Sequence, residues 1–138
     1  MNRTINSKLD SNNFPYIDVE IINPANDKFV RGKAIIDTGA AYCLLKQSLI
    51  TYLELQHVDG TSYLHPQYGE RQASNYRINL SFDLANVDGA AQLQMLRVSV
   101  IESEEYPAAM IIGVELLKLC QFNYDGINKT FQLTLTSN

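Results

Sequence analysis

Residues 34–40, with the sequence AIIDTGA, constrain the fold more than any other part of the chain, because they place one carboxylate at the end of an apolar run. Charged side chains are rarely buried unless they are paired or hydrogen-bonded. The stretch therefore predicts a core strand that delivers Asp37 to a constrained turn. Thr38 supplies a short hydroxyl, and Gly39 either lets another backbone approach closely or adopts a positive φ. Taken alone, the stretch is also typical of a strand that ends in an exposed turn.

A second stretch, residues 108–117, follows a similar plan: an apolar strand, then Gly113, then a short helical pattern. Residues 16–21 precede the first stretch and residues 76–82 precede the second, each with the alternation of a half-buried strand. The pattern indicates that the chain contains the same unit twice. In this interpretation Ile111-Ile112-Gly113 stands where a second Asp would be needed.

This ordered pair of motifs, Asp37-Thr38-Gly39-Ala40 followed by Ile111-Ile112-Gly113 and a short helix, resembles the retropepsin-like aspartic proteases, the single-domain relatives of pepsin. The resemblance covers residues 14–135. It implies an all-β fold, mainly β with two short helices, in which a closed pepsin-like or retropepsin-type barrel forms one lobe per chain of a homodimer. It also implies that Asp37 is catalytic, and that the structural residues of the active site are Thr38, Gly39, Ala40, Ile112 and Gly113.

The length of 138 residues suits one domain with a hydrophobic core and is too short for two ordinary ones. We expect this domain over residues 14–138, after an N-terminal extension of residues 1–13. Apolar residues at 46% and charged residues at 19% indicate a soluble globular protein, and no apolar run is long enough to span a bilayer. Residues 1–13 are polar and contain no secretory signal, so we expect a cytoplasmic location unless a signal was removed.

Several classes of partner and chemistry are not expected. The net charge of −4 and the lack of a Lys/Arg cluster argue against nucleic acid. Cys43 and Cys120 lack the spacing of metal ligands and are expected to be buried free thiols, and His57 and His65 are too few for a zinc site. We therefore expect no metal, no cofactor, no nucleic acid and no membrane, and we find no signature of Cys-His or Ser-His-Asp catalysis.

The first half of the chain predicts a hairpin before Asp37 and a short helix after it. We expect strands over residues 14–22 and 29–36, joined by a turn over residues 23–27. Ser48 is expected to cap a helical turn that runs through residues 52–55.

The second half predicts two paired strands, residues 78–84 and 93–101, around a turn at residues 86–89. An acidic loop at residues 102–107 and a helix over residues 114–120 follow. The last strand, residues 130–135, is expected to be able to pair with a partner chain, because exposed edge strands invite such pairing.

Residues 57–80 predict a long hairpin, with its tip at Pro66, Gln67, Tyr68 and Gly69. A surface hairpin without function explains the pattern of turn residues and aromatics equally well. In the family that the chain resembles, this segment is the flap, a hairpin that closes over a bound peptide. The resemblance therefore implies that these four residues bind substrate.

Peptide hydrolysis without a metal or a covalent nucleophile needs a general base and a general acid, and two carboxyl groups can supply both. The sequence offers one suitable Asp, because Asp59-Gly60, Asp88-Gly89 and Asp125-Gly126 lack the preceding apolar strand and are better explained as turns. A working site therefore requires Asp37 from each of two chains, related by a two-fold axis.

The predicted function is that of an aspartic endopeptidase, active as a homodimer on a peptide or protein substrate. The alternative is a catalytically silent peptide-binding or dimerisation module with the same fold, since a fold does not guarantee a function. Retention of Asp37, Thr38 and Gly39 together favours the enzyme, because a binding module could dispense with two apposed carboxylates.

The sequence also departs from the family pattern. Many retroviral members carry acidic residues after the Ala, where this chain has Ala41 and Tyr42, and many carry Arg after the second Gly, where this chain has Val114 and then Glu115. The tip of the hairpin is not rich in Gly. These differences concern substrate preference and the flap, and they leave Asp37 in place.

Overall fold

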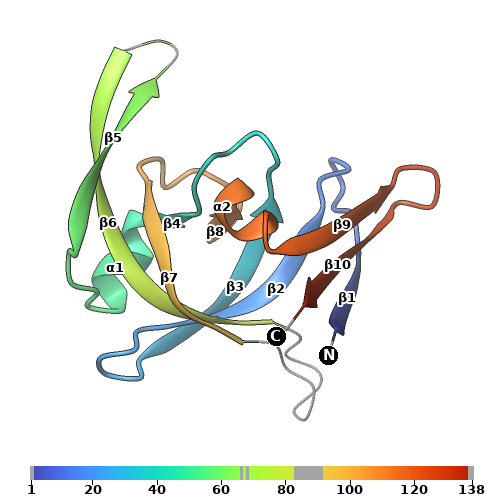
Figure 1. Ribbon diagram of the computed structural model, residues 1–138, viewed down its shortest axis with the longest axis horizontal. Coiled ribbons are helices and arrows are strands. Elements are labelled where there is room, and N and C mark those ends of the chain that lie inside the picture. The colour runs from blue at the N-terminus through green and yellow to red at the C-terminus, as the bar shows by residue number, and fades with distance from the viewer. Residues whose placement is uncertain (1, 66, 68, 83–91, 137–138) are drawn as a thin grey trace.

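The computed structural model describes residues 2–65, 67, 69–82 and 92–136, and it consists mainly of β-strands with two short helices (Figure 1). In chain order the elements are β1 (Asn2–Lys8), β2 (Tyr16–Ile22), β3 (Phe29–Ile36), β4 (Leu44–Lys46), α1 (Gln47–Tyr52), β5 (Asp59–His65), β6 (Gly69–Ser81), β7 (Gln92–Ile101), β8 (Met110–Ile112), α2 (Val114–Leu117), β9 (Cys120–Asp125) and β10 (Thr130–Thr136). In the described part of the chain, neither helix is long and apolar enough to cross a membrane.

Six strands close into a barrel. Hydrogen bonds join them in the order β2-β3-β8-β4-β7-β6, and β6 pairs back onto β2, with Ile21 opposite Leu80. Strand β5 continues the sheet outside the ring as the partner of the outer half of β6. The expected closed, all-β barrel is therefore confirmed.

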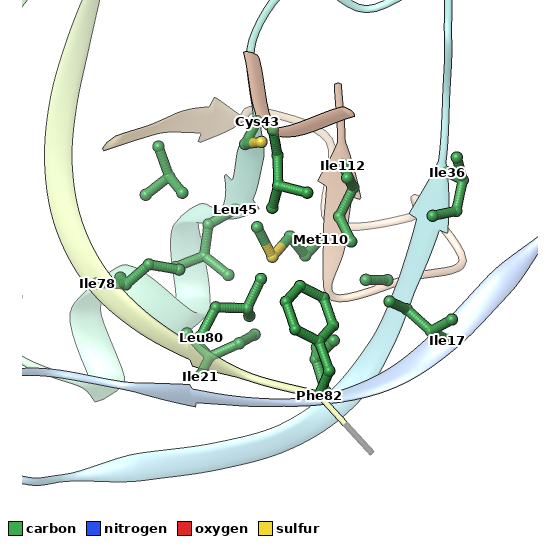
Figure 2. Close-up of a cluster of buried hydrophobic side chains, with 14 of the residues drawn as sticks. Ile17, Ile21, Ile36, Cys43, Leu45, Ile78, Leu80, Phe82, Met110 and Ile112 are labelled. Atoms are coloured by element: carbon green, nitrogen blue, oxygen red, sulfur yellow. The ribbon is translucent and has the colours of Figure 1, made fainter. Parts of the chain in front are cut away.

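The core lies inside this ring and follows from the alternation of the strands. On β2 the buried positions are Ile17, Val19 and Ile21, and on β6 the buried apolar positions are Ile78 and Leu80, while all three residues of β8 are buried. Figure 2 shows side chains of this core, among them Ile17, Ile78 and Met110, converging from different walls of the barrel. A strand that is buried on both faces reads as a continuous apolar run, which explains the sequence of β8.

The strand pairing shows an internal repeat, but its correspondence differs from the predicted one. Strand β3 pairs in parallel with β8, and β7 pairs in parallel with β4, while β2·β3 and β6·β7 are antiparallel pairs. The unit β2-β3-β4-α1 therefore corresponds to β6-β7-β8-α2. The counterpart of β8 is β4, and the counterpart of the Asp37 loop is the loop of residues 102–109. The prediction that Ile111-Ile112-Gly113 stands in the place of a second Asp is wrong, because these residues lie at the end of β8, which corresponds to β4 and not to the end of β3.

The two ends of the chain form a separate three-stranded sheet, in the order β1-β10-β9. The sequence predicts no strand before residue 14, yet β1 pairs with β10 along its whole length, from Asn2 opposite Thr136 to Lys8 opposite Thr130. The first part of the expected extension thus belongs to the fold. Because β1 and β9 occupy both sides of β10, the prediction of an edge strand at the C-terminal end is also wrong.

Smaller differences concern the helices and turns. Helix α1 begins at Gln47, so Ser48 lies inside it and does not cap it; instead, the Glu104 carboxylate accepts hydrogen bonds from the Ser48 N–H (3.0 Å) and hydroxyl (2.8 Å). Helix α2 ends at Leu117 and strand β9 begins at Cys120, where the sequence predicts a continuing helix. Asp59-Gly60, expected as a turn, is the beginning of β5.

Other predicted elements agree with the structure. The strand over residues 29–36 has the observed bounds of β3, and the turn before it is held by Asn23, whose side chain accepts a hydrogen bond from Ala25 N–H (2.9 Å). The predicted pairing of residues 78–84 with residues 93–101 corresponds, within the described residues, to the antiparallel pair β6·β7. The turn predicted at residues 86–89, which includes Asp88-Gly89, lies outside the described residues.

Candidate active site

Asp37 lies in the loop of residues 37–43, which connects two strands that do not pair with each other. Strand β3 ends at Ile36 and β4 begins at Leu44, and β8 lies between them in the sheet. The loop must therefore pass over the end of β8, as its position at the top of the barrel in Figure 1 shows. The Asp37 N–H donates a hydrogen bond to the Ile112 carbonyl oxygen (2.9 Å), which fixes the start of the loop to the last residue of β8.

The Asp37 carboxylate is exposed in the single chain and held from within its own turn. Its Oδ1 accepts a hydrogen bond from Gly39 N–H (2.8 Å), and the Asp37 carbonyl oxygen accepts one from Ala40 N–H (3.2 Å). Neither role predicted for Gly39 is observed: its φ is not positive, and a Cβ atom there would lie 3.2 Å from Asp37 Oδ1, a side-chain atom of the same turn and not another backbone. Thr38 is exposed beside it. A carboxylate with one oxygen fixed and its face open to solvent can act on a bound molecule.

The second half of the loop packs on α2. Val114 N–H donates to the Ala40 carbonyl oxygen (2.8 Å), and Glu115 N–H donates to that of Ala41 (3.1 Å). Gly113 lies directly below, where a Cβ atom would stand 2.6 Å from the Ala40 oxygen. The structure thus brings Ala40, Ile112 and Gly113 together around the turn that carries Asp37.

A groove of about 730 Å³ opens beside Asp37. Its walls come from the loop between β1 and β2, the end of β3, the loop before β8, and β9; its aromatic lining residues are Phe14, Tyr106, Phe122 and Tyr124. Partial burial raises the pKa of the Tyr106 hydroxyl, and the negative charge of Asp37 raises this pKa further. The groove therefore combines the Asp37 carboxylate with aromatic walls and with the polar side chains of the loop between β1 and β2, and Lys33 also lines it. No periodic pattern in the sequence places these four aromatic residues together.

The predicted long hairpin is formed by β5 and the outer half of β6, which pair from Asp59 opposite Asn75 to His65 opposite Gly69. In Figure 1 the hairpin projects from the barrel at the upper end of the view, where the Asp37 loop also lies. Gly69 has φ 77°, a conformation that favours glycine, and Gln67 is exposed. The other two predicted tip residues, Pro66 and Tyr68, lie outside the described residues.

Comparison with known proteins gives a likeness in structure. No family model matches the sequence, and no curated protein matches it. Among the solved structures similar to this chain is a retropepsin-like aspartic protease from Rickettsia conorii, with a TM-score of 0.65 and 17% sequence identity, over 98% of this chain and 92% of that one. The fold is retropepsin-like. At such low identity the likeness carries the fold, and the activity has to be argued from the site.

Within this retropepsin-like fold, an ion pair that the sequence did not predict stands beside the Asp37 loop. Arg97 on β7 places its Nη2 3.2 Å from Glu115 Oε2 on α2, and its Cζ lies 5.4 Å from the centroid of the Tyr42 ring. Glu115 is one of the two residues at which the sequence departs from the family pattern after Gly113. The only indication of a role for Arg97 in the sequence is that it is a charged residue within a predicted strand.

The two cysteines are free thiols, and Cys43 is buried as expected whereas Cys120 is half-buried. Burial raises the pKa of each thiol to about 11, so both are protonated near neutral pH. Across the described residues, no three side chains of His, Cys, Asp or Glu gather in a way that could hold a metal ion.

Proposed function

We propose that this chain is one subunit of a homodimeric aspartic endopeptidase, in which Asp37 of each of two chains contributes one catalytic carboxyl group. One observation carries the proposal: Asp37 stands exposed on a loop that is fixed at both ends, at the wall of a groove large enough for several side chains. The retropepsin-like fold supports it, because the similar protein from Rickettsia conorii is described as an aspartic protease.

Half of the catalytic site is present in one chain. Among the described residues, the other Asp-Gly sequences stand in different settings: Asp125 accepts hydrogen bonds within the β9–β10 turn, and Asp59 begins β5. The exposed Asp37 turn is therefore where a second chain would supply the missing carboxyl group. A two-fold axis next to this turn places two copies of Asp37 side by side, as an isologous dimer requires.

The proposed chemistry follows from that apposition. Two carboxyl groups about 3 Å apart cannot both be ionised, so the pair holds one shared proton; aspartic proteases are the standard example of this behaviour. The ionised carboxylate takes a proton from water, whose oxygen attacks the peptide carbonyl carbon, while the other carboxyl group gives its proton to the carbonyl oxygen. When the tetrahedral intermediate collapses, the C–N bond breaks, the leaving nitrogen receives a proton from one carboxyl group, and one hydroxyl group of the intermediate gives its proton to the other carboxylate, which restores the pair.

The surroundings of Asp37 suit a peptide substrate. The aromatic walls of the groove offer apolar contacts to substrate side chains. We propose that the β5–β6 hairpin serves as a flap, with residues 66–69 as the substrate-binding tip, as in the family that the chain resembles. Thr38 and Gly39 are the structural partners of the catalytic residue, and the exposed backbone of Gly39 is available to a substrate. The cytoplasmic location remains a prediction, which cell fractionation would test.

The substitution Asp37→Asn tests the proposal, because it keeps the shape of the side chain and removes the group that accepts the proton of water. The wild type should cleave members of a diverse peptide library screened from about pH 3 to about pH 8, the range in which carboxyl groups and His titrate, and Asp37→Asn should cleave none. Asp18→Asn is the matched control, since Asp18 is an exposed carboxylate on β2. If the wild type binds peptides but cleaves none, a silent peptide-binding or dimerisation module is the better description.

A further inference from the structure

Three segments that are distant in the sequence meet at Arg97. The guanidinium comes from β7, the Glu115 carboxylate at 3.2 Å comes from α2, and the Tyr42 ring at 5.4 Å comes from the loop that carries Asp37. The side chains of Arg97 and Glu115 are 29% and 21% exposed, so solvent screens this ion pair less than it screens an ordinary surface pair. The contact joins the loop and the helix through one residue of the barrel wall.

The position of Arg97 on the sheet is unfavourable without such partners. In the β6·β7 pair, Arg97 lies directly opposite Arg77, and residues directly opposite each other in an antiparallel pair have their side chains on the same face. Like charges in this arrangement repel each other. Arg77 donates a hydrogen bond to the Met95 carbonyl oxygen (3.1 Å), and Glu115 brings a negative charge to Arg97. The strand pair alone therefore gives no reason for a guanidinium at this position, whereas the contacts with the loop and the helix do.

The same loop and helix are also joined by their backbones. Val114 N–H and Glu115 N–H donate to the carbonyl oxygens of Ala40 and Ala41, and Ser99 N–H on β7 donates to that of Cys43 (2.9 Å). Helix α2 has four residues and no side-chain cap, so it is too short to be stable without tertiary contacts. Contacts that hold α2 in place therefore also hold the carbonyl groups of the Asp37 loop.

We propose that Arg97 is a positioning residue for Asp37: its guanidinium, held between the Tyr42 ring and the Glu115 carboxylate, locks the loop of residues 37–43 onto α2. The catalytic consequence rests on the proposed peptidase function, but the lock itself does not. Arginine suits this place, because a planar guanidinium can stack on a ring and donate to a carboxylate at the same time, which an ammonium group cannot do.

Amide hydrogen exchange in the full chain tests the lock without requiring activity. Val114 and Glu115 amides report the contact between α2 and the loop, and the Gly39 amide, 2.8 Å from Asp37 Oδ1, reports the carboxylate itself. Arg97→Met should raise the exchange rates of these three amides by about tenfold, the effect of losing one hydrogen bond to a charged group. Arg97→Lys should give an intermediate increase, because it keeps the charge and loses the planar face.

Arg31→Met is the matched control. Arg31 forms an ion pair with Glu20 at a similar distance, 3.1 Å, across β2 and β3, and this pair has no partner on the Asp37 loop among the contacts of the described residues. The same substitution there should leave the three amides unchanged. Equal exchange in Arg97→Met and Arg31→Met would overturn the proposal, and so would faster exchange at Val114 and Glu115 with no change at Gly39.

Kinetic measurements test whether Arg97 affects catalysis, and they distinguish the positioning role of Arg97 from the proposed peptidase function. If the wild type cleaves peptides, Arg97→Met should lower kcat by about tenfold with little change in KM, because a displaced catalytic group affects the reaction more than substrate binding. An unchanged kcat would refute the positioning role. If the wild type cleaves nothing, the peptidase proposal fails, and the exchange rate of the Gly39 amide still decides whether Arg97 positions Asp37.

Discussion

Gly113 lies so close to Ala40 that a Cβ atom on Gly113 would stand 2.6 Å from the Ala40 carbonyl oxygen, and closer still to that of Tyr42. The backbone of Gly113 has φ −100°, which any residue can adopt, so the requirement is for space and not for a left-handed conformation. The loop that carries Asp37 can cross the end of β8 this closely only because Gly113, which it passes over, has no side chain.

Gly113→Ala should therefore destabilise the fold. The added methyl group meets backbone atoms that cannot rotate away, so we expect the free energy of unfolding to fall by about 2 kcal/mol or more. Urea unfolding followed by circular dichroism measures this change. Gly126→Ala is the control, because its Cβ atom would meet the edge of the Tyr124 ring at 3.3 Å and a side chain can move. Equal losses in the two variants would contradict the steric explanation.

A buried polar contact lies where β6 leaves the barrel to form the hairpin. The Ser99 hydroxyl donates to Asn75 Oδ1 at 2.6 Å, and the two residues are 6% and 1% exposed. Ser99→Ala removes this donor from a buried oxygen, which should cost about 1–3 kcal/mol of unfolding free energy. The control is Ser7→Ala, which removes a hydroxyl bonded to the Tyr16 carbonyl oxygen in a partly exposed place and should cost less. Denaturant unfolding at one pH compares the two, and a larger loss in Ser7→Ala would refute the role of burial.

The two buried thiols predict a loss of stability at alkaline pH. Burial raises the pKa of Cys43 and Cys120 from 9.0 to about 11, so the folded chain keeps protons that the unfolded chain releases. Their contribution is fully present below pH 9 and is lost as the pH rises to about 11. For the pair, a loss on the order of 2 kcal/mol is expected after allowance for the partial exposure of Cys120.

A variant with Cys43→Ala and Cys120→Ala provides the comparison, because it cannot release these protons. The two substitutions also remove packing and so lower stability at every pH. The relevant measurement is therefore the change in stability between about pH 8 and about pH 11, a window set to bracket the thiol titration. Unfolding under reducing conditions should show a steeper decline in the wild type than in the variant. Parallel declines would show that other groups control alkaline stability.

The barrel and the Asp37 turn could be predicted because their residues carry strong local patterns. Alternation marks β2 and β6, a continuous apolar run marks β8, and Asp37 interrupts such a run where a strand must end. These signals come from side chains that face a common core, so they survive without knowledge of the neighbouring strands.

The terminal sheet and the contacts around α2 could not be predicted from local patterns. Strand β1 has one large apolar residue, Ile5, opposite Leu133, and its other positions are polar, so nothing in its own sequence marks it as a strand. The lock at Arg97 depends on three segments that meet only in the fold. The sequence pattern equates β8 with the end of β3, whereas its counterpart in the fold is β4. This correspondence follows from the pairing of β4 with β7, which no local pattern indicates.

The mixing of wild-type and Asp37→Asn chains gives the sharpest prediction about the shared site. If a functional site needs Asp37 from both chains, and the chains exchange freely, an equal mixture leaves about a quarter of the dimers with two Asp residues. Activity per mole of total chain should then fall to about a quarter of the wild-type value, whereas chains that act alone would retain about half. Peptide cleavage should be measured after incubation long enough for subunit exchange, with Asp18→Asn chains mixed in the same ratio as the control. Retention of half of the activity, at concentrations where sedimentation shows dimers, would mean that each chain carries a complete site and that a second Asp37 is not part of the mechanism.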